Sequence, residues 1–249
     1  MKYRAVAFDI DGTLYPSLGL YLGHIGFGLR NYRILTTFSR VRHELHSLAM
    51  DPGKRKSLPR DLQGFRKLQA SLLAERGGLG FEEAKDWIER VMYGELESFF
   101  ATIRLFPGVE AALTRLSREG LRLAALSDFP APGKLASIGL SRFFEIAMSS
   151  EESGMLKPAP EPFFDLAARL GLQSAEILYV GNSPSLDIAG AHGAGMDAAL
   201  RGGGAIKKII REPYAPRGAD KSHSSQPELS FSNWNDLVSF ALDGSHPRS

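Results

Sequence analysis

The 249-residue sequence predicts an α/β fold: a doubly wound parallel sheet with an all-helical segment inserted after its first strand. Three observations support this prediction. Residues 3–9 form a short apolar run that indicates a buried strand. Residues 16–104 show helical spacing of apolar residues and no convincing strand. After residue 107, helical and strand-like segments alternate, which is typical of parallel sheets covered by helices on both faces.

The inserted segment contains three expected helices. Apolar residues recur at three- and four-residue spacing over 34–48, 62–73 and 81–99. Helix breakers at 51–53 and 77–80 separate these stretches. We therefore predict a helical cap at 16–104, and a core made of 1–15 and 105–249.

The alternating half supplies the rest of the sheet. We expect helices at 109–118, 162–170, 186–194 and 234–242, and strands at 121–126, 146–148, 177–180 and 198–200. Residues 212–228 are polar and rich in Pro, Ser and Gly, which predicts a surface loop.

Composition narrows the function classes. Thirty Lys and Arg against 28 Asp and Glu give a net charge of +2, so we expect no nucleic-acid partner. The chain has no cysteine, which excludes disulfides, thiolate metal sites and cysteine nucleophiles. The apolar stretch 18–27 is too short to span a bilayer, and no signal peptide is evident at the start. We expect a cytoplasmic protein with no membrane partner.

Two acids follow the first strand. Asp9 and Asp11 are one residue apart, and strand alternation would place them on the same side of the backbone. Carboxylates held so close repel each other unless a cation or a shared proton lies between them. The pair therefore indicates a reaction site rather than a stabilising feature.

Other polar residues follow later strands. Because ligands of open parallel sheets bind beyond the carboxyl ends of the strands, these residues are expected at one edge with the two acids. They are Ser127 and Asp128, Lys157, Asn182 and Asp187.

The chain resembles the haloacid dehalogenase-like hydrolase superfamily. Four motifs occur in order: Asp9-Ile10-Asp11-Gly12-Thr13, Ser127, Lys157-Pro158, and Gly181-Asn182-Ser183 through Asp187. The resemblance implies a Rossmann-like core, and the helical insert stands where type-one caps of the superfamily stand. It also implies phosphoryl transfer from a small phosphorylated substrate through an aspartyl-phosphate.

The resemblance assigns roles. Asp9 would be the nucleophile, and Asp11 the general acid and then the general base, for which its pKa should be raised. Ser127 and Lys157 would contact the phosphoryl group, and Asp128 is a further candidate substrate contact. Mg²⁺ would be held by Asp9, the backbone carbonyl of Asp11, Asp187 and Asn182.

Two details refine this reading. Members that cleave carbon–halogen bonds lack an acid two residues after the nucleophile, so Asp11 favours phosphoryl transfer. Asn182 stands where the family usually has aspartate and offers Mg²⁺ a neutral oxygen. We therefore expect weaker Mg²⁺ binding than with three carboxylates, although Asn182 could instead bind through water or cap the following helix.

Some residues were assigned no catalytic role. Glu151 and Glu152 are expected to be surface charges, and His43 and His46 to lie on an ordinary helix surface. Arg42 belongs to a basic, aromatic stretch that is either a solvated face or a grip for an anionic substrate.

Two alternatives remain open. A phosphomutase would keep the same core residues, and a non-catalytic binding protein could retain the fold. The sequence does not identify the substrate, for which sugar phosphates and nucleoside monophosphates are plausible, or the oligomeric state.

Overall fold

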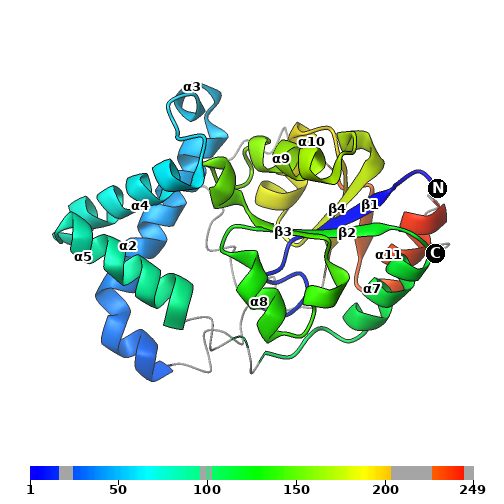
Figure 1. The fold of residues 1–249 in the computed structure, drawn as a ribbon, viewed down its shortest axis with the longest axis horizontal. Helices are drawn as coiled ribbons and strands as arrows, with labels where there is room; N and C mark the ends of the chain where they lie inside the picture. The colour runs from blue at the N-terminus through cyan, green and yellow to red at the C-terminus, as the bar shows by residue number, and fades with distance from the viewer. Residues whose placement is uncertain (17–24, 96–99, 101–102, 203–225, 244–249) are drawn as a thin grey trace.

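The computed structural model describes residues 1–16, 25–95, 100, 103–202 and 226–243, and these form a six-stranded sheet with helices on both faces (Figure 1). All strand pairs are parallel, in the order β3-β2-β1-β4-β5-β6. The strands are β1 Ala5–Phe8, β2 Arg122–Ser127, β3 Ile146–Ser149, β4 Ile177–Gly181, β5 Asp197–Arg201 and β6 Leu229–Phe231. The predicted doubly wound α/β fold is confirmed, with β6 as an unpredicted edge strand.

The topology places a ligand site beside β1. The strand order reverses direction between β1 and β4, and the register pairs Phe8 with both Ala125 of β2 and Val180 of β4. The carboxyl ends of these three strands are therefore nearly level. A crevice at such a switch point is where doubly wound sheets bind ligands.

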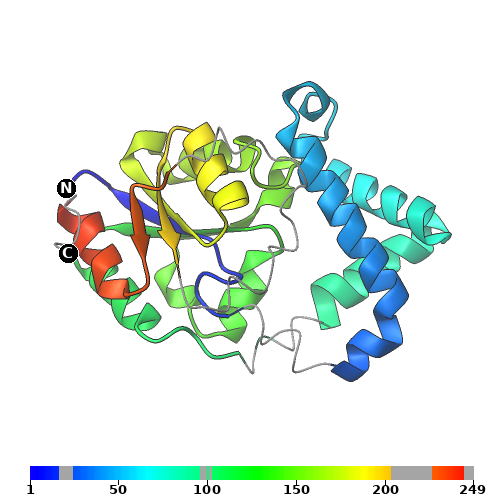
Figure 2. The same ribbon diagram turned by 180° about the vertical axis from the view of Figure 1, so that it is seen from behind.

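Alternation along β1 divides the core into two layers. Val6 and Phe8 pack with helices α7 (Val109–Arg118) and α11 (Trp234–Asp243). Ala5 and Ala7 face the opposite way, toward α9 (Glu161–Leu170) and α10 (Ala189–Gly193). Figure 2 shows β5, β6 and α11 at the end of the molecule away from the inserted helices.

The inserted helices lie to one side of the sheet (Figure 1). They are α2 Ile25–Met50, α3 Pro52–Arg55, α4 Leu62–Gly77, α5 Phe81–Trp87 and the π-helical η1 Ile88–Glu95. We call residues 25–95 the helical insert. The first two predicted helices are confirmed, although α2 begins at residue 25 rather than 34. Residues 96–99 of the third prediction lie outside the described part of the chain.

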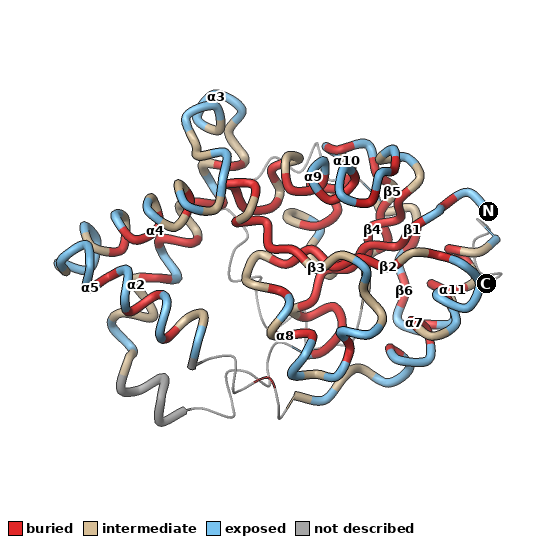
Figure 3. The backbone as a smooth tube through the Cα atoms, in the orientation of Figure 1, coloured by how far each residue is buried: buried red, intermediate tan, exposed pale blue. Residues whose placement is uncertain are grey.

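The helical insert has its own apolar core, which continues into the sheet half. Phe38, Val41 and Phe65 are buried in one cluster with Leu156, which belongs to the segment after β3. Figure 3 shows buried residues on α2 and α4 that alternate with exposed ones, as expected for helices with one packed face.

Three local differences from the sequence expectations have physical reasons. Asp51 does not simply break a helix: its side chain accepts hydrogen bonds from the backbone of Gly53 and Lys54, which starts α3. The helix expected at 186–194 is instead the π-helical turn η5 Pro184–Ile188 followed by α10. The loop expected at 212–228 falls mostly outside the described residues.

Helix α8, Ala131–Ser137, was not predicted, since Pro132 and Gly133 lower its helical propensity. Across the described ranges, no helix combines the length and apolarity needed to cross a bilayer.

Candidate active site

Asp9 directly follows β1 and is nearly enclosed. Its backbone N–H donates to the carbonyl of Val180 at 2.9 Å, which continues the pairing with β4. The residue is 5% exposed, and its carboxylate has two partners. Oδ2 accepts from the hydroxyl of Thr13 at 2.8 Å, and Oδ1 accepts from the ammonium of Lys157 at 2.8 Å.

Lys157 links Asp9 to Asp187. Its Nζ is 2.8 Å from Oδ1 of Asp9 and 2.7 Å from Oδ1 of Asp187, and all three side chains are buried. The hydroxyl of Tyr179 lies 3.4 Å from the same nitrogen. Lys157 and Asp187 follow Asp9 by 148 and 178 residues in the sequence, and the structure brings all three together, as the sequence predicts.

The electrostatics of this group favour a further cation. Burial raises the pKa of Asp9 to about 7, and Asp187 and Asp11 add to the rise although Lys157 opposes it. Burial disfavours the charged form of Lys157, but Asp187 and Asp9 outweigh it and hold the lysine pKa well above its ordinary value. One ammonium therefore does not fully offset the cost of ionising Asp9 in this buried site.

Asp11 has a separate set of partners. Its Oδ1 accepts from the hydroxyl of Tyr15 at 2.5 Å, and its Oδ2 accepts from the hydroxyl of Ser127 at 3.1 Å. The ammonium of Lys134 also pairs with Oδ2. The strand ends at Phe8, so the alternation argument does not reach Asp11, and the two acids lie in different surroundings.

The expected rise in the pKa of Asp11 is wrong for this structure. Burial alone would raise that pKa, but the charge of Lys134 and the hydrogen bonds from Lys134, Tyr15 and Ser127 lower it below its ordinary value. It is Asp9 whose pKa is raised, because burial outweighs the opposing charge of Lys157.

Lys134 was missed by the sequence analysis. It lies on α8, seven residues after Ser127, and its Nζ is 3.2 Å from the Ser127 hydroxyl. The sequence offered one signal: Lys134 follows shortly after β2, a strand that ends at the site. Pro132 and Gly133 made the helix that carries it hard to recognise.

Asp187 and Asn182 follow β4 and form the part of the site next to that strand. Oδ2 of Asp187 accepts the backbone N–H groups of Asn182 and Ser183, both at 2.9 Å, which orients the carboxylate toward Lys157. The Asn182 amide lies against Gly12, where a Cβ would meet Nδ2 at 2.2 Å. Gly12 also has a φ of +86°, a backbone conformation that favours glycine at this turn, and a side chain there would displace the Asn182 amide.

Asp128 is turned to other partners. Its Oδ1 accepts from the hydroxyl of Ser150 at 2.5 Å and from the backbone N–H of Lys157 at 3.2 Å. Burial would raise its pKa, but Lys157, His46 and Arg42 lower it. Its carboxylate therefore organises the loop that carries Lys157.

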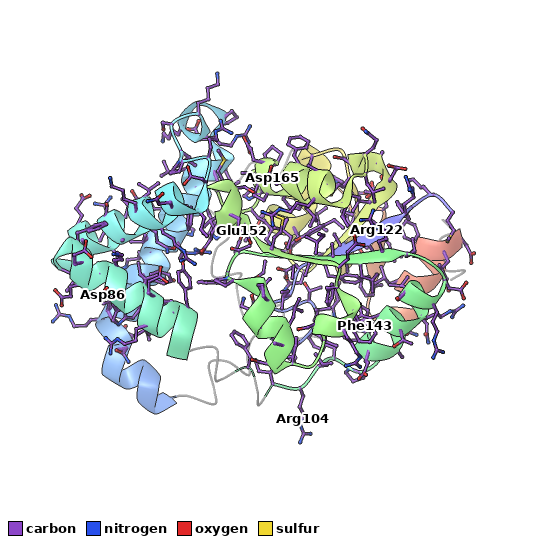
Figure 4. All side chains as sticks on the ribbon, in the orientation of Figure 1. Asp86, Arg104, Arg122, Phe143, Glu152 and Asp165 are labelled. Atoms are coloured by element: carbon purple, nitrogen blue, oxygen red, sulfur yellow. The ribbon has the colours of Figure 1, made fainter. Side chains whose placement is uncertain are left out.

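Three expectations about the neighbouring polar residues are wrong. Glu151 and His46 are 0% and 3% exposed, so neither is a surface group. Arg42 is 1% exposed and pairs with Glu151 at 2.5 Å, so it is neither solvated nor free for an anion. Glu152, labelled in Figure 4, is partly buried and pairs with Arg169 at 2.8 Å, whereas the labelled Arg104 points away from the body of the molecule.

The oxygen atoms of this site are of the type that binds hard cations such as Mg²⁺. Asp9 and Asp187 offer carboxylate oxygens, the donors that Mg²⁺ prefers. Three carboxylates (Asp9, Asp11 and Asp187) face two ammonium groups (Lys134 and Lys157), which leaves an excess of negative charge. Within the described ranges, no cluster of three or more His, Cys, Asp or Glu residues is arranged to hold a metal by itself.

Known proteins resemble this chain over most of its length. A glyceraldehyde 3-phosphate phosphatase of Methanopyrus kandleri is 30% identical over 203 residues, which covers 78% of this chain and 81% of the relative. A phosphoglycolate phosphatase of Haemophilus influenzae is 26% identical over 197 residues, which covers 78% of this chain and 83% of the relative.

Solved structures show the same fold. The L-2-haloacid dehalogenase of Xanthobacter autotrophicus with chloropropionic acid covalently bound has a TM-score of 0.64 at 18% identity, covering 98% of this chain and all of that one. A haloacid dehalogenase-like phosphatase from Thermococcus onnurineus has a TM-score of 0.54 at 20% identity, with the same coverage. The family model of the haloacid dehalogenase-like hydrolases matches residues 3–195. This chain therefore belongs to the haloacid dehalogenase-like hydrolases and is an enzyme of that family.

Proposed function

We propose that this protein is a Mg²⁺-dependent phosphomonoester hydrolase that acts through an aspartyl-phosphate. The observation that carries the proposal is the pair Asp9 and Asp11, two acids one residue apart with different partners. Asp9 is buried beside Lys157, and Asp11 is bound by Lys134, Ser127 and Tyr15. Two carboxyl groups in different surroundings are suited to two different tasks.

Each residue has a chemical task in this proposal. A carboxylate oxygen of Asp9 attacks phosphorus, and the bond from phosphorus to the alcohol oxygen breaks. Asp11, which Lys134 holds ionised in this structure, must first take up a proton; it gives that proton to the alcohol oxygen and then removes a proton from the water that hydrolyses the aspartyl-phosphate. Lys157 offsets negative charge on the transferring group, and the hydroxyl of Ser127 donates to a phosphoryl oxygen.

The proposed ligands of Mg²⁺ are the carboxylates of Asp9 and Asp187, the backbone carbonyl of Asp11 and the side chain of Asn182. When bound, it would neutralise part of the charge shared by the phosphoryl oxygens and the carboxylates. Burial, with smaller contributions from Asp187 and Asp11, raises the pKa of Asp9, and a cation bound there would favour the ionised carboxylate, which supports this placement.

The proposed substrate is a short phosphorylated metabolite. Two similar proteins are a glyceraldehyde 3-phosphate phosphatase and a phosphoglycolate phosphatase, so two- and three-carbon phosphomonoesters come first. Sugar phosphates and nucleoside monophosphates remain in the test panel. Figure 1 shows the helical insert beside the sheet half, and we propose that it closes over the bound substrate and excludes water.

The test is a turnover assay with p-nitrophenyl phosphate, phosphoglycolate, glyceraldehyde 3-phosphate, a hexose phosphate and a nucleoside monophosphate. We expect release of phosphate that needs Mg²⁺ and is lost in Asp9→Asn. Acid quenching should trap a phosphoryl group on a peptide containing Asp9. A folded wild-type protein that releases no phosphate from any of these compounds would contradict the proposal. Dependence on a bisphosphate activator would instead favour a mutase.

A further inference from the structure

The main chain of Lys157 is held on both sides by side-chain groups. Its backbone N–H donates to Oδ1 of Asp128 at 3.2 Å. Its carbonyl lies 2.6 Å from Nδ1 of His46. Because a carbonyl oxygen can only accept, Nδ1 of His46 carries the hydrogen and is the donor.

The His46 ring is suited to this single donor role. The side chain is 3% exposed. Burial lowers the pKa of His46, with Arg42 and Lys157 acting in the same direction and Asp128 and the bond to the Lys157 backbone opposing them. Burial therefore favours the neutral ring, whose hydrogen on Nδ1 is directed to the Lys157 carbonyl while Nε2 lies 3.6 Å from Oδ2 of Asp128.

His46 does not belong to the sheet half of the protein. It lies on α2 of the helical insert, 111 residues before Lys157 in the sequence. One helical turn earlier, Arg42 donates from Nη2 to the carbonyl of Asp128 at 2.5 Å and pairs through Nη1 with Glu151. One face of α2 thus contacts the loops that follow both β2 and β3.

Close packing surrounds these polar contacts. Leu156, the residue before Lys157, is 1% exposed within the apolar core of the helical insert. The guanidinium of Arg42 lies 4.2 Å from the ring centroid of Phe129. Gly154 lies against Pro59 of the insert, where a Cβ would be 2.3 Å from the Pro59 carbonyl oxygen. The segment 154–157 is therefore packed directly against the insert.

The position of the Lys157 ammonium depends on its own main chain. Nζ reaches Asp9 and Asp187 at 2.8 and 2.7 Å, distances that a small shift of the backbone would lengthen. If α2 moved away, the Lys157 carbonyl would lose its donor, and the loop would lose the packing around Leu156.

We propose that His46 is a positioning residue that places the Lys157 ammonium against Asp9 and Asp187 when the helical insert closes on the sheet half. The inference rests on the proposed phosphohydrolase function, in which Lys157 offsets charge on the transferring group. Closure of the insert and completion of the reactive site are then the same event, because one hydrogen bond from α2 is part of both.

The kinetic test uses three variants of the full chain. His46→Leu removes the donor, His46→Asn keeps an N–H group near the position of Nδ1, and His43→Leu is the matched control on the same helix. His43 is a suitable control because its Nδ1 makes no hydrogen bond to the described residues. Should His46→Leu fail to fold, His46→Gln replaces it, since its longer side chain carries the amide away from the Nδ1 position.

We expect His46→Leu to lower kcat by about 10- to 100-fold with little change in KM, because misplacing a group that acts in the transition state affects the chemical step. His46→Asn should recover most of kcat, and His43→Leu should match the wild type. An unchanged kcat in His46→Leu, or a His46→Asn as slow as His46→Leu, would overturn the proposal.

Amide hydrogen exchange gives a reading that does not need activity. In His46→Leu, the backbone amide of Lys157 should exchange about 10-fold faster than in the wild type, whereas His43→Leu should leave it unchanged. Unchanged exchange in His46→Leu would show that His46 does not hold this loop and would overturn the inference. If the wild type hydrolyses no phosphomonoester, the proposed function fails, and the exchange result alone decides whether His46 positions Lys157.

Discussion

The ammonium of Lys134 pairs with Oδ2 of Asp11, and the two side chains are 6% and 29% exposed. Lys134 also lies 3.2 Å from the hydroxyl of Ser127, so it joins two of the proposed catalytic groups. Through this pair Asp11 is held in its ionised form, while burial raises the pKa of Asp9 to about 7. The two neighbouring acids thus differ in pKa because burial prevails at Asp9, whereas Lys134 and the hydrogen bonds from Tyr15 and Ser127 prevail at Asp11.

Replacing Lys134 by Met should move the pH dependence of the reaction. Without the ammonium, burial is the main influence on Asp11 and raises its pKa. A general acid with a higher pKa stays protonated to higher pH, so the alkaline limb of kcat/KM should shift upward. The measurement is a pH profile of kcat/KM with p-nitrophenyl phosphate. Asp11→Asn, the control that removes the acid, should lose about 10²- to 10⁴-fold in kcat. A Lys134→Met profile that overlays the wild type would contradict this role of Lys134.

Asp9 should make the metal-free protein less stable as the pH rises. Its carboxyl titrates near 3.8 in an unfolded chain and near 7 in the native protein. Between these values the native state binds more protons than the unfolded state, so the free energy of unfolding falls with rising pH and levels off above about pH 7. The loss between pH 5.5 and pH 8 should be about 2 kcal/mol, because about 1.5 pH units separate pH 5.5 from the native pKa and each unit is worth about 1.4 kcal/mol. Urea unfolding with a chelator at pH 5.5 and pH 8 measures it.

Asp9→Asn is the control for that pH dependence. The variant cannot ionise at residue 9, so its stability should change less between the two pH values than that of the wild type. Mg²⁺ should stabilise the wild type more at pH 8 than at pH 5.5, because its proposed ligand is then ionised. A wild type and an Asp9→Asn with parallel pH dependences would count against the raised pKa.

The positions of Asp9, Ser127, Lys157 and Asp187 at one sheet edge could be predicted because each follows a strand-like segment. Parallel strands bring such ends together whatever their separation in the chain. The surroundings of Asp11 could not be predicted in this way, because β1 ends at Phe8 and the chain turns at Gly12.

Contacts between the helical insert and the sheet half could not be predicted. Arg42 and Glu151 are 109 residues apart, and nothing in the local pattern of either residue indicates the other. Periodicity assigns a helical residue to a face, but it does not say whether that face meets solvent or another part of the chain. For this reason a buried ion pair was interpreted as surface charge.

Asn182→Asp should tighten the response to Mg²⁺. The change adds a third carboxylate beside Asp9 and Asp187 while keeping the shape of the side chain. We expect the half-maximal Mg²⁺ concentration to fall about 10-fold, a change worth about 1.4 kcal/mol. With a chelator present, the added charge should lower thermal stability relative to wild type at pH 8. Ser185→Asp, a nearby control, should leave the Mg²⁺ titration unchanged. An Asn182→Asp that needs as much Mg²⁺ as the wild type would show that residue 182 is not a ligand.

Arg42→Met should destabilise the protein more than most single substitutions. Glu151 is 0% exposed, and its Oε1 lies 2.5 Å from Nη1 of Arg42. Burial raises the pKa of Glu151, and Arg42 is the main influence that opposes the rise. Removing one partner of a buried pair leaves the other charge without compensation, which costs about 3–5 kcal/mol. Chemical denaturation at pH 7.5 measures this loss. Arg40→Met, on an exposed position of the same helix, should change stability by no more than about 0.5 kcal/mol.

The double variant Arg42→Met/Glu151→Gln separates lost charge from lost packing. A neutral amide at residue 151 no longer requires a cation, and its side chain still lies within reach of the Tyr93 hydroxyl, which is 2.9 Å from Oε2 in the native protein. The double variant should therefore be more stable than Arg42→Met alone, although it does not restore the hydrogen bond from Arg42 to the Asp128 carbonyl. If the two variants were equally unstable, the role of Arg42 would be to hold the loop after β2 rather than to neutralise Glu151.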